Sequence, residues 1–245
     1  MKRIIILLLS ACCLSGAAFN QAQQLFLLCV RKAPPAPPLP YDAEVEYLES
    51  TGTQWIDTGI HGRDGLQVRT RAMPIVGYVY GTNLSKTYLV FRLSADAQHL
   101  SGGAWSPSVN FTDFPVSSGA IHEILADTTS GNKSVAIDGT TVRSWTSTST
   151  AVSTLTLGLF AYHNSSMLES HYGQSRIYSF SVHDTSTGQL LLDLIPVRFT
   201  NEQGQSEGAM YDRLGVGGMN PDGSPRTDGL YRNRGTGAFI IGPAK

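Results

Sequence analysis

From Tyr41 onward, short apolar runs alternate with clusters of Gly, Asn, Asp and Ser. The runs recur about every ten residues and are rich in β-branched and aromatic residues, which is typical of strands separated by turns. Helix-forming residues are scarce, so long amphipathic helices are not expected. The pattern predicts an all-β fold, either a β-sandwich or a jelly roll.

Two predicted hairpins have explicit turn chemistry. Asp138-Gly139, between the runs at 134–137 and 140–145, is a favoured two-residue turn. Residues 184–189, with the sequence DTSTGQ, join two apolar arms and supply the small polar residues that turns prefer. We therefore expect an antiparallel strand pair around each turn.

The arms around the second turn differ in pattern. In the arm 176–184, alternation assigns to the core face Tyr178, Phe180 and Val182. It assigns to the opposite face Ile177, Ser179, Ser181 and His183. The arm 190–197 is nearly all apolar, which predicts a strand buried on both faces and ending at Pro196, because proline cannot donate to a ladder.

The stretch 47–60, YLESTGTQWIDTGI, fits either a ligand-binding rim or two short strands. We favour strands turned at Ser50–Thr53, because aromatic and β-branched residues in such a pattern usually belong to a core. Asp57-Thr58-Gly59 is then expected to form side-chain-to-backbone turn bonds. The residues to be divided between core and edge are Tyr47, Leu48, Trp55 and Ile56.

Charge and cysteine content exclude several classes of partner. The 245 residues carry a formal charge of -1. The first 40 positions contain four basic residues and no acidic residue, so the body from Tyr41 onward has 14 basic and 19 acidic residues. Such a body has no basic field for nucleic acid or for an anionic membrane surface. The three cysteines, Cys12, Cys13 and Cys29, precede it, so it can form neither a disulfide nor a thiolate metal site.

The N-terminus resembles an export signal. Residues 2–18 combine a basic start, an apolar run and small residues. Leu9-Ser10-Ala11-Cys12 resembles a bacterial lipobox, which makes Cys12 a candidate for lipidation, whereas plain cleavage near Ala17 or Ala18 is the alternative. A membrane anchor that includes the apolar patch 25–30 ranks third, because polar residues interrupt it.

The chain is thus expected to consist of three parts. Residues 1–30 are the signal or anchor segment, 31–40 a Pro-rich linker, and 41–245 the folded domain. The sequence APPAPPLP favours polyproline II, so the linker is expected to act as a semi-rigid spacer.

Four segments of the body resemble a known family. They are the opening YLESTGTQWIDTGI, the hairpin RIYSFSVHDTSTGQLLLDLIPVR, the segment MYDRLG and the closing LYRNRGTGAFIIGP. Together they resemble concanavalin A-like lectin/glucanase domains of the laminin G-like type, found in exported gut-bacterial and phage-associated proteins. The resemblance extends from about Glu46 to Pro243. It implies a jelly roll of two antiparallel sheets, in which the opening and closing segments pair.

Catalytic motifs are weak. Glu44, Glu46 and Glu49 form E-x-E-x-x-E, similar to the E-x-D-x-x-E that laminarinase-type glucanases carry on a bulged strand. The middle Asp is replaced, the motif lies at the start of the domain, and no Trp-rich cleft sequence surrounds it. The six histidines show no H-E-x-x-H and no G-x-S-x-G partner. We therefore expect no enzymatic activity, and a glycoside hydrolase is the least favoured function.

Two kinds of binding site remain open. Calcium is a weak candidate cofactor, because the loop NPDGSPRTDG offers oxygen ligands from Asn220, Asp222 and Asp228. Glycan binding needs an aromatic plate beside hydroxyl-binding groups. The residues that could provide both are Trp105, Asn110, Tyr162, His163 and Asn164.

The sequence favours an exported, non-catalytic binding module that recognises glycans at the bacterial cell envelope, as a lipoprotein or a secreted protein. The alternative is a structural or adhesive module that binds a cell-surface protein and has no sugar site. In both hypotheses nucleic acid is not a partner, and the membrane is contacted only through an N-terminal lipid or anchor.

Overall fold

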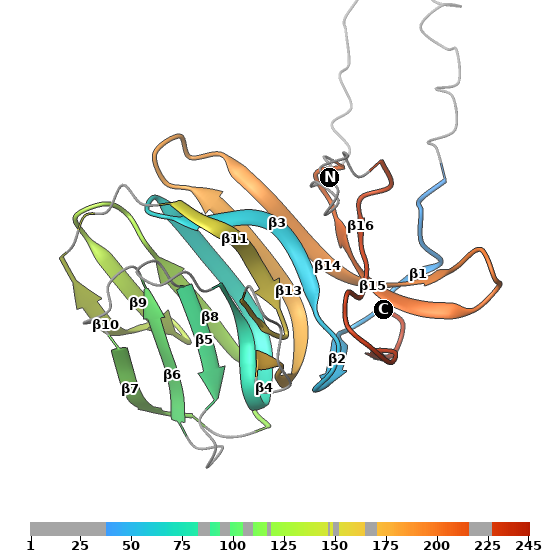
Figure 1. Ribbon diagram of the computed structural model, residues 1–245, viewed down its shortest axis with the longest axis horizontal. Helices are drawn as coiled ribbons and strands as arrows, with labels where there is room; N and C mark the ends of the chain where they lie inside the picture. The colour runs from blue at the N-terminus through green and yellow to red at the C-terminus, as the bar shows by residue number, and fades with distance from the viewer. Residues whose placement is uncertain are drawn as a thin grey trace, which may run out of the picture. The chain divides into compact units, whose positions relative to one another are not determined.

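Strands make up most of the structure (Figure 1). The computed structural model describes residues 38–82, 89–93, 99–104, 110–116, 119–146, 148, 152–164, 171–215 and 227–245. Leu39–Lys245 form one compact unit. Within the described ranges, no helix has the length and apolar character needed to cross a membrane.

The strands form two sheets that share one long strand, β4 (Leu66–Thr82). Besides the first part of β4, sheet I contains β1 (Ala43–Glu44), β2 (Leu48–Thr51), β8 (His122–Asp127), β9 (Lys133–Ile137), β10 (Thr140–Trp145), β13 (Gln174–Asp184), β14 (Leu190–Thr200), β15 (Ser206–Asp212), β16 (Leu230–Tyr231) and β17 (Ile240–Ile241). Besides the end of β4, sheet II contains β3 (Ile56–Arg63), β5 (Leu89–Leu93), β6 (His99–Ala104), β7 (Asn110–Pro115), β11 (Val152–Leu159) and β12 (Tyr162–His163).

Strand order confirms the jelly-roll β-sandwich. Sheet I runs β10–β9–β8–β4–β13, after which β13 pairs with β2 through its first half and with β14 through its second. Sheet II runs β3–β11–β4–β5–β6–β7. These pairings are antiparallel as expected; the short β12, which pairs parallel to β4, is an exception.

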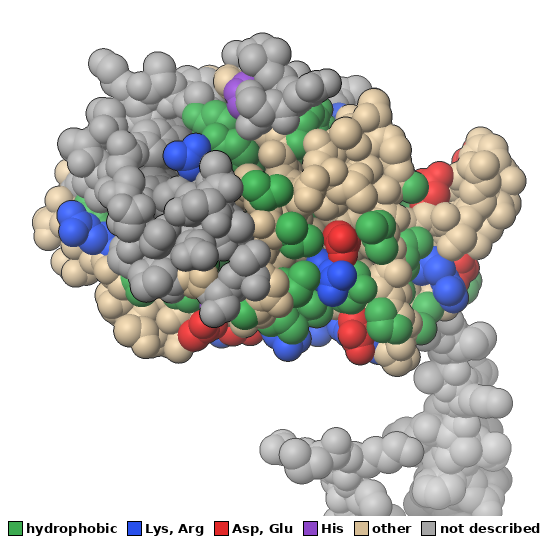
Figure 2. All heavy atoms as spheres, turned by 90° about the horizontal axis from the view of Figure 1, so that it is seen from below, with side chains coloured by type: hydrophobic (Ala, Val, Ile, Leu, Met, Phe, Trp, Pro, Cys, Tyr) green, Lys and Arg blue, Asp and Glu red, His purple; other side chains and the backbone are tan. Residues whose placement is uncertain are grey.

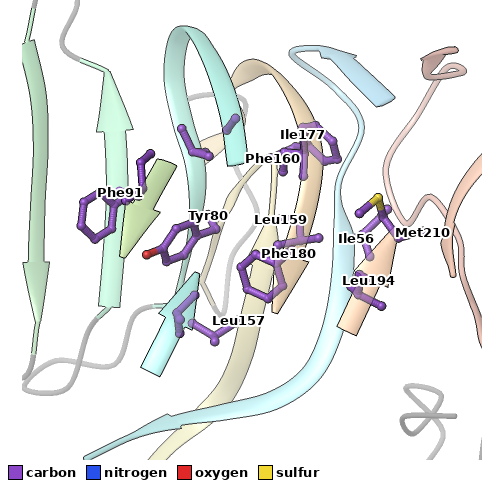
Figure 3. Packing of buried hydrophobic residues seen from close by; sticks show 14 of the residues in the cluster. Ile56, Tyr80, Phe91, Leu157, Leu159, Phe160, Ile177, Phe180, Leu194 and Met210 are labelled. Carbon is purple, nitrogen blue, oxygen red and sulfur yellow. The ribbon is translucent and has the colours of Figure 1, made fainter. Parts of the chain in front are cut away.

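The main core lies between the two sheets. Figure 3 shows Phe180 of sheet I near Tyr80, Leu157 and Leu159 of sheet II, and Leu194 of sheet I belongs to the same core cluster. The Tyr80 and Phe180 rings meet edge to face with centroids 5.6 Å apart. Because aromatic side chains bury large apolar areas, such contacts across the sandwich are a major source of its stability.

The opening and closing segments lie side by side, as the family resemblance implies. β17 pairs with β2, joining Ile240 to Glu49 and Ile241 to Leu48. Within 47–60, Leu48 and Ile56 are fully buried, and Trp55 is nearly so. Side-chain-to-backbone turn bonds also form, since Gly59 N donates to Asp57 Oδ1 at 2.9 Å. The structural interpretation of this stretch is confirmed.

The Asp138-Gly139 hairpin is confirmed too. Both residues have positive φ, 50° and 79°, as a type I′ turn requires. The Asp138 carboxylate also binds the strand beside it, 2.7 Å from His122 Nδ1 and accepting from Glu123 N. Partial burial raises the pKa of Asp138, but these two hydrogen bonds outweigh it and the net shift is downward.

The predicted faces of β13 are partly wrong because the strand contains a β-bulge. Its register against β4 shifts between Ile177 and Ser179, so Tyr178 is an extra residue. As a result Ile177 and Phe180 both point into the core, whereas Tyr178 lies on the outer side. There its ring contacts Tyr47 at 5.5 Å. Val182 is buried as predicted.

β14 does not end at Pro196 but continues to Thr200. Pairing with β13 stops at Leu194 and pairing with β1 starts at Val197, so Pro196 lies where the strand changes partner. Its missing N–H therefore breaks no ladder bond. The face of the strand opposite Leu192 and Leu194 joins a small separate core made by Ile195, Val197, Phe199, Ala209 and Leu230.

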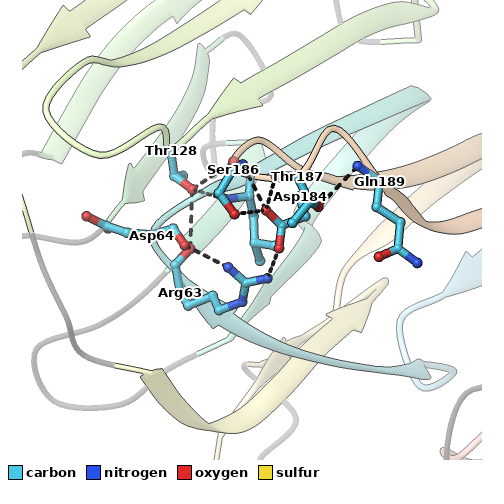
Figure 4. Close-up of polar contacts among 8 residues, drawn as sticks. Arg63, Asp64, Thr128, Asp184, Ser186, Thr187 and Gln189 are labelled. Carbon is cyan, nitrogen blue, oxygen red and sulfur yellow. Dashed lines mark hydrogen bonds and ion pairs between the residues drawn. The ribbon is translucent and has the colours of Figure 1, made fainter.

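A polar network closes one end of the sandwich (Figure 4). Asp184, the last residue of β13, accepts hydrogen bonds from Ser186 Oγ and from Arg63 Nη2, at 2.5 and 2.6 Å. The backbone N–H groups of Ser186 and Thr187 donate to it as well. These contacts, led by that of Ser186 Oγ, hold the pKa of Asp184 well below its usual range.

We expect Asp184→Asn to weaken the fold at neutral pH and to matter less in acid. A carboxylate with a lowered folded pKa contributes stability above its unfolded pKa of about 3.9, and loses it as the pH falls through the folded value. Urea unfolding at neutral pH and below about pH 3 tests this, with Glu202→Gln in the exposed hairpin tip as the control. A stability difference that stays constant with pH would contradict the assignment.

Candidate functional site

The outer surface of sheet II carries an aromatic cluster at the junction of β4, β5 and β12. The rings of Tyr78 and Tyr162 stack, with centroids 5.2 Å apart and planes inclined by 15°. His171 meets Tyr162 edge to face at 5.6 Å. The guanidinium of Arg92, which lies opposite Tyr78 on β5, is 6.0 Å from the Tyr78 ring centre. Both tyrosines are partly exposed, so this cluster reaches the surface.

Two glycines allow the cluster to form. A Cβ on Gly173 would lie 1.9 Å from Tyr78 O, and a Cβ on Gly77 would lie 2.9 Å from Tyr172 O. The segment 171–173 can therefore approach the backbone of β4 only because these positions lack side chains. This approach places His171 beside the tyrosine pair.

A polar chain adjoins the aromatic cluster. Thr156 Oγ1 donates to Asp57 Oδ1 at 2.5 Å, and His163 Nδ1 lies 2.9 Å from Thr156 O and 3.1 Å from its Oγ1. Since a carbonyl oxygen can only accept, Nδ1 of His163 carries the hydrogen. In the neutral ring Nε2 is then an acceptor, which suits a ligand hydroxyl.

Local backbone geometry brings this chain and the tyrosines together. Phe160 has a φ of 62°, and the turn it forms folds β12 back against β11. Gly158 faces the returning chain, where a Cβ would lie 3.3 Å from that of His163 and 3.4 Å from Trp55 Cε3. Trp55 packs on the His163 ring at 4.8 Å. Consecutive residues of β12 thus contribute to both parts of the site.

Tyr162, His163 and Asn164, predicted as glycan contacts, lie at this place. Trp105 lies outside the described residues, and Asn110 belongs to β7, where only the backbone is described. The lipidation candidate Cys12 also lies outside the described residues.

Of the three calcium candidates, only Asp228 belongs to the described residues; Asn220 and Asp222 do not. Asp228 accepts from Leu230 N and forms an ion pair with Arg232. Burial by itself raises the pKa of Asp228. The hydrogen bonds from Arg232 and from Leu230 N have the opposite effect, and the net shift of the pKa is downward. Among the described residues, no group of three His, Cys, Asp or Glu side chains could hold a metal ion.

The sequence interpretation missed Tyr78, His171 and Arg92 as site residues. Tyr78 and Tyr80 have the same parity, so alternation puts them on one face, yet a register shift against β5 separates them. The Tyr80 side chain is buried in the core, whereas that of Tyr78 is partly exposed at the surface. The signal that could have indicated this is Gly77, whose positive φ of 76° marks an irregular strand.

The E-x-E-x-x-E motif does not form one bulged strand. Glu44 belongs to β1 and is exposed, whereas Glu49 belongs to β2. Glu49 is engaged by the guanidinium of Arg176, which also lies over the Tyr47 ring. The pair of carboxylates facing one sugar that a glucanase needs is therefore not built here.

The β14–β15 hairpin projects from the sheets (Figure 1), and residues of it line two depressions. One, of about 510 Å³, includes Phe199, Asp228 and Arg232, and the other, of about 480 Å³, includes Asn233 and Phe239. Both phenyl rings are more than nine-tenths buried, and Arg232 covers that of Phe199. The described residues that line these depressions thus offer no exposed ring on which a sugar could stack.

Charges are mixed on the surface that Figure 2 draws. Basic and acidic side chains lie next to one another among hydrophobic ones, so the described part of this face has no patch of a single sign. The described part of this face therefore has no long-range field of one sign.

Comparisons with known proteins add little. No model of a protein family matches the chain, and a search of curated proteins finds no match. Among solved structures, the chain is similar to the native heptameric SAP-like pentraxin from Limulus polyphemus, with 9% identity and a TM-score of 0.46. The similarity covers 85% of this chain and 98% of that one. At this level it does not bear on function, which must be argued from the site itself.

Proposed function

We propose that this protein is an exported, non-catalytic module that binds glycans at the bacterial cell envelope, through the outer surface of sheet II. The observation that carries the proposal is the partly exposed Tyr78–Tyr162 stack next to His163. Aromatic rings bind the C–H face of a pyranose, while imidazole and guanidinium groups bind its hydroxyls. Export is supported by the signal-like sequence at 2–18.

The non-catalytic part of the proposal is supported by the carboxylates. Glu49 is held by Arg176, and Asp57 accepts from Thr156 and from Gly59 N. Groups that are engaged in this way serve local structure. They are poor candidates for the paired acid and nucleophile of a glycosidase.

We expect Tyr162→Ala to reduce glycan affinity at least about fivefold, since stacking of a ligand ring on one aromatic side chain contributes roughly 1–3 kcal/mol. The protein should be screened on a glycan array with and without calcium, and the best ligand then titrated against each variant. Tyr178→Ala is the matched control, because Tyr178 is a partly exposed tyrosine in contact with another ring on the outer side of sheet I.

The array result separates the candidate functions. Binding that is lost in Tyr162→Ala and kept in Tyr178→Ala supports the proposed site, and the opposite result places it on sheet I. If the folded protein bound no glycan on a broad array, the result would favour the protein-interaction module. The candidate surface for that function is the two depressions beside the β14–β15 hairpin.

A further inference from the structure

A lysine is buried at the end of the sandwich. Lys133 is the first residue of β9, and its side chain points to the core side with those of Val135 and Ile137. The side chain is 0% exposed, and its Nζ lies 2.6 Å from Oδ1 of Asp64, which is 9% exposed. Asp64 belongs to the turn between β3 and β4, so the contact connects residues 69 positions apart.

This ammonium group is poorly satisfied. It has three N–H donors, but among the described residues it donates only to Asp64. Removing an ammonium from water without full hydrogen bonding is costly, and one carboxylate compensates it only in part. An amide linking the same two side chains would carry no charge and a single N–H. It would remove both the unsolvated charge and the unused donors.

We infer that Lys133 and Asp64 condense into an intramolecular isopeptide bond as the domain folds. In the reaction, one proton passes from Nζ to the carboxylate along the hydrogen bond that joins them, which gives a neutral amine and a neutral carboxylic acid. The amine attacks Cγ of Asp64, a C–N bond forms and a C–O bond breaks. The departing oxygen carries away two protons that were on the ammonium nitrogen, so that one water leaves and no oxidant or other reactant is consumed.

Such a bond would replace a disulfide. The chain has no cysteine after Cys29, so the domain has no other side chains for a covalent cross-link of that kind. A cross-link over a long stretch of chain restricts the unfolded state, and it stabilises most where that stretch is long. It would hold the β3–β4 turn to sheet I, and this suits a domain that works outside the cell.

Digestion with trypsin tests the inference on the full chain. Because trypsin cleaves after unmodified Lys and Arg, an unlinked protein gives separate peptides 64–69, 93–133 and 134–143. A linked protein cannot be cleaved after Lys133. It gives the peptide 64–69 joined to 93–143, lighter by one water than the two together, and fragmentation of this species should locate the bond.

Two controls make the result decisive. Lys133→Met also removes the cleavage site, but it must give 64–69 and 93–143 as two separate peptides. Full chain that is kept in concentrated denaturant from synthesis onward must remain unlinked. Recovery of unmodified 64–69 and 93–133 as the main products of the folded wild-type protein would overturn the inference. That measurement does not depend on whether any variant folds.

Discussion

Asp64→Ala should destabilise the domain by about 3–5 kcal/mol, because it leaves the Lys133 ammonium in the core without its acceptor. For a domain of this size, the loss corresponds to a fall in Tm of roughly 10 °C. This loss is the one expected for an ion pair. Where the two side chains are joined by an amide, the variant also removes the cross-link, and the loss is larger. Calorimetry or urea unfolding measures it.

The double variant Asp64→Ala/Lys133→Met should recover much of the part of the loss that comes from the stranded ammonium, because it removes the buried charge and keeps an apolar chain of similar length. Arg213→Ala provides the matched comparison. Arg213 pairs with Asp193 but is 57% exposed, so its loss should cost less than about 1 kcal/mol. Equal effects of the buried and the exposed substitutions would show that burial of Lys133 is not what matters.

Gly173→Ala should cost at least about 3 kcal/mol and should also weaken ligand binding. The added Cβ would lie 1.9 Å from Tyr78 O and 2.3 Å from Tyr78 N, and these backbone atoms cannot move without distorting β4. Relief requires the segment 171–173 to move away. His171 would then leave its contact with Tyr162. Thermal unfolding and glycan titration report the two effects separately.

Gly131→Ala is the control for Gly173→Ala. Gly131 has a φ of 87° and nothing within 4 Å of an added Cβ, so alanine there should cost only the strain of a left-handed backbone, about 1–2 kcal/mol. It should leave ligand binding unchanged. A Gly173→Ala protein that is as stable as Gly131→Ala and binds as the wild type does would contradict the close approach of 171–173 to β4.

The sequence was sufficient wherever the fold follows from local rules. The Asp138-Gly139 turn, the hairpin at 184–189 and the burial of Leu48 and Ile56 depend on the conformations of a few neighbouring residues and on simple alternation. The pairing of the opening and closing segments followed from the family resemblance instead.

Local reasoning was wrong where neighbouring strands imposed an irregular register. Alternation placed Tyr178 in the core and Ile177 outside, and a bulge against β4 reversed both. Pro196 was expected to end its strand, but the change of partner from β13 to β1 makes the missing N–H harmless there. Such events depend on what lies beside the strand, so the strand's own sequence does not determine them.

By itself, the sequence determined the fold class, the turns and the presence of an aromatic and polar segment at 162–164. Only the tertiary structure decided which partners that segment has. Tyr78 and Asp57 are far from it in the chain and reach it through strand pairing. His171 is close in the chain, but it meets Tyr162 through a backbone approach that Gly77 and Gly173 permit. The physical reason is that turns and alternation are local properties, whereas a site forms from contacts whose geometry is set by the packing of both sheets.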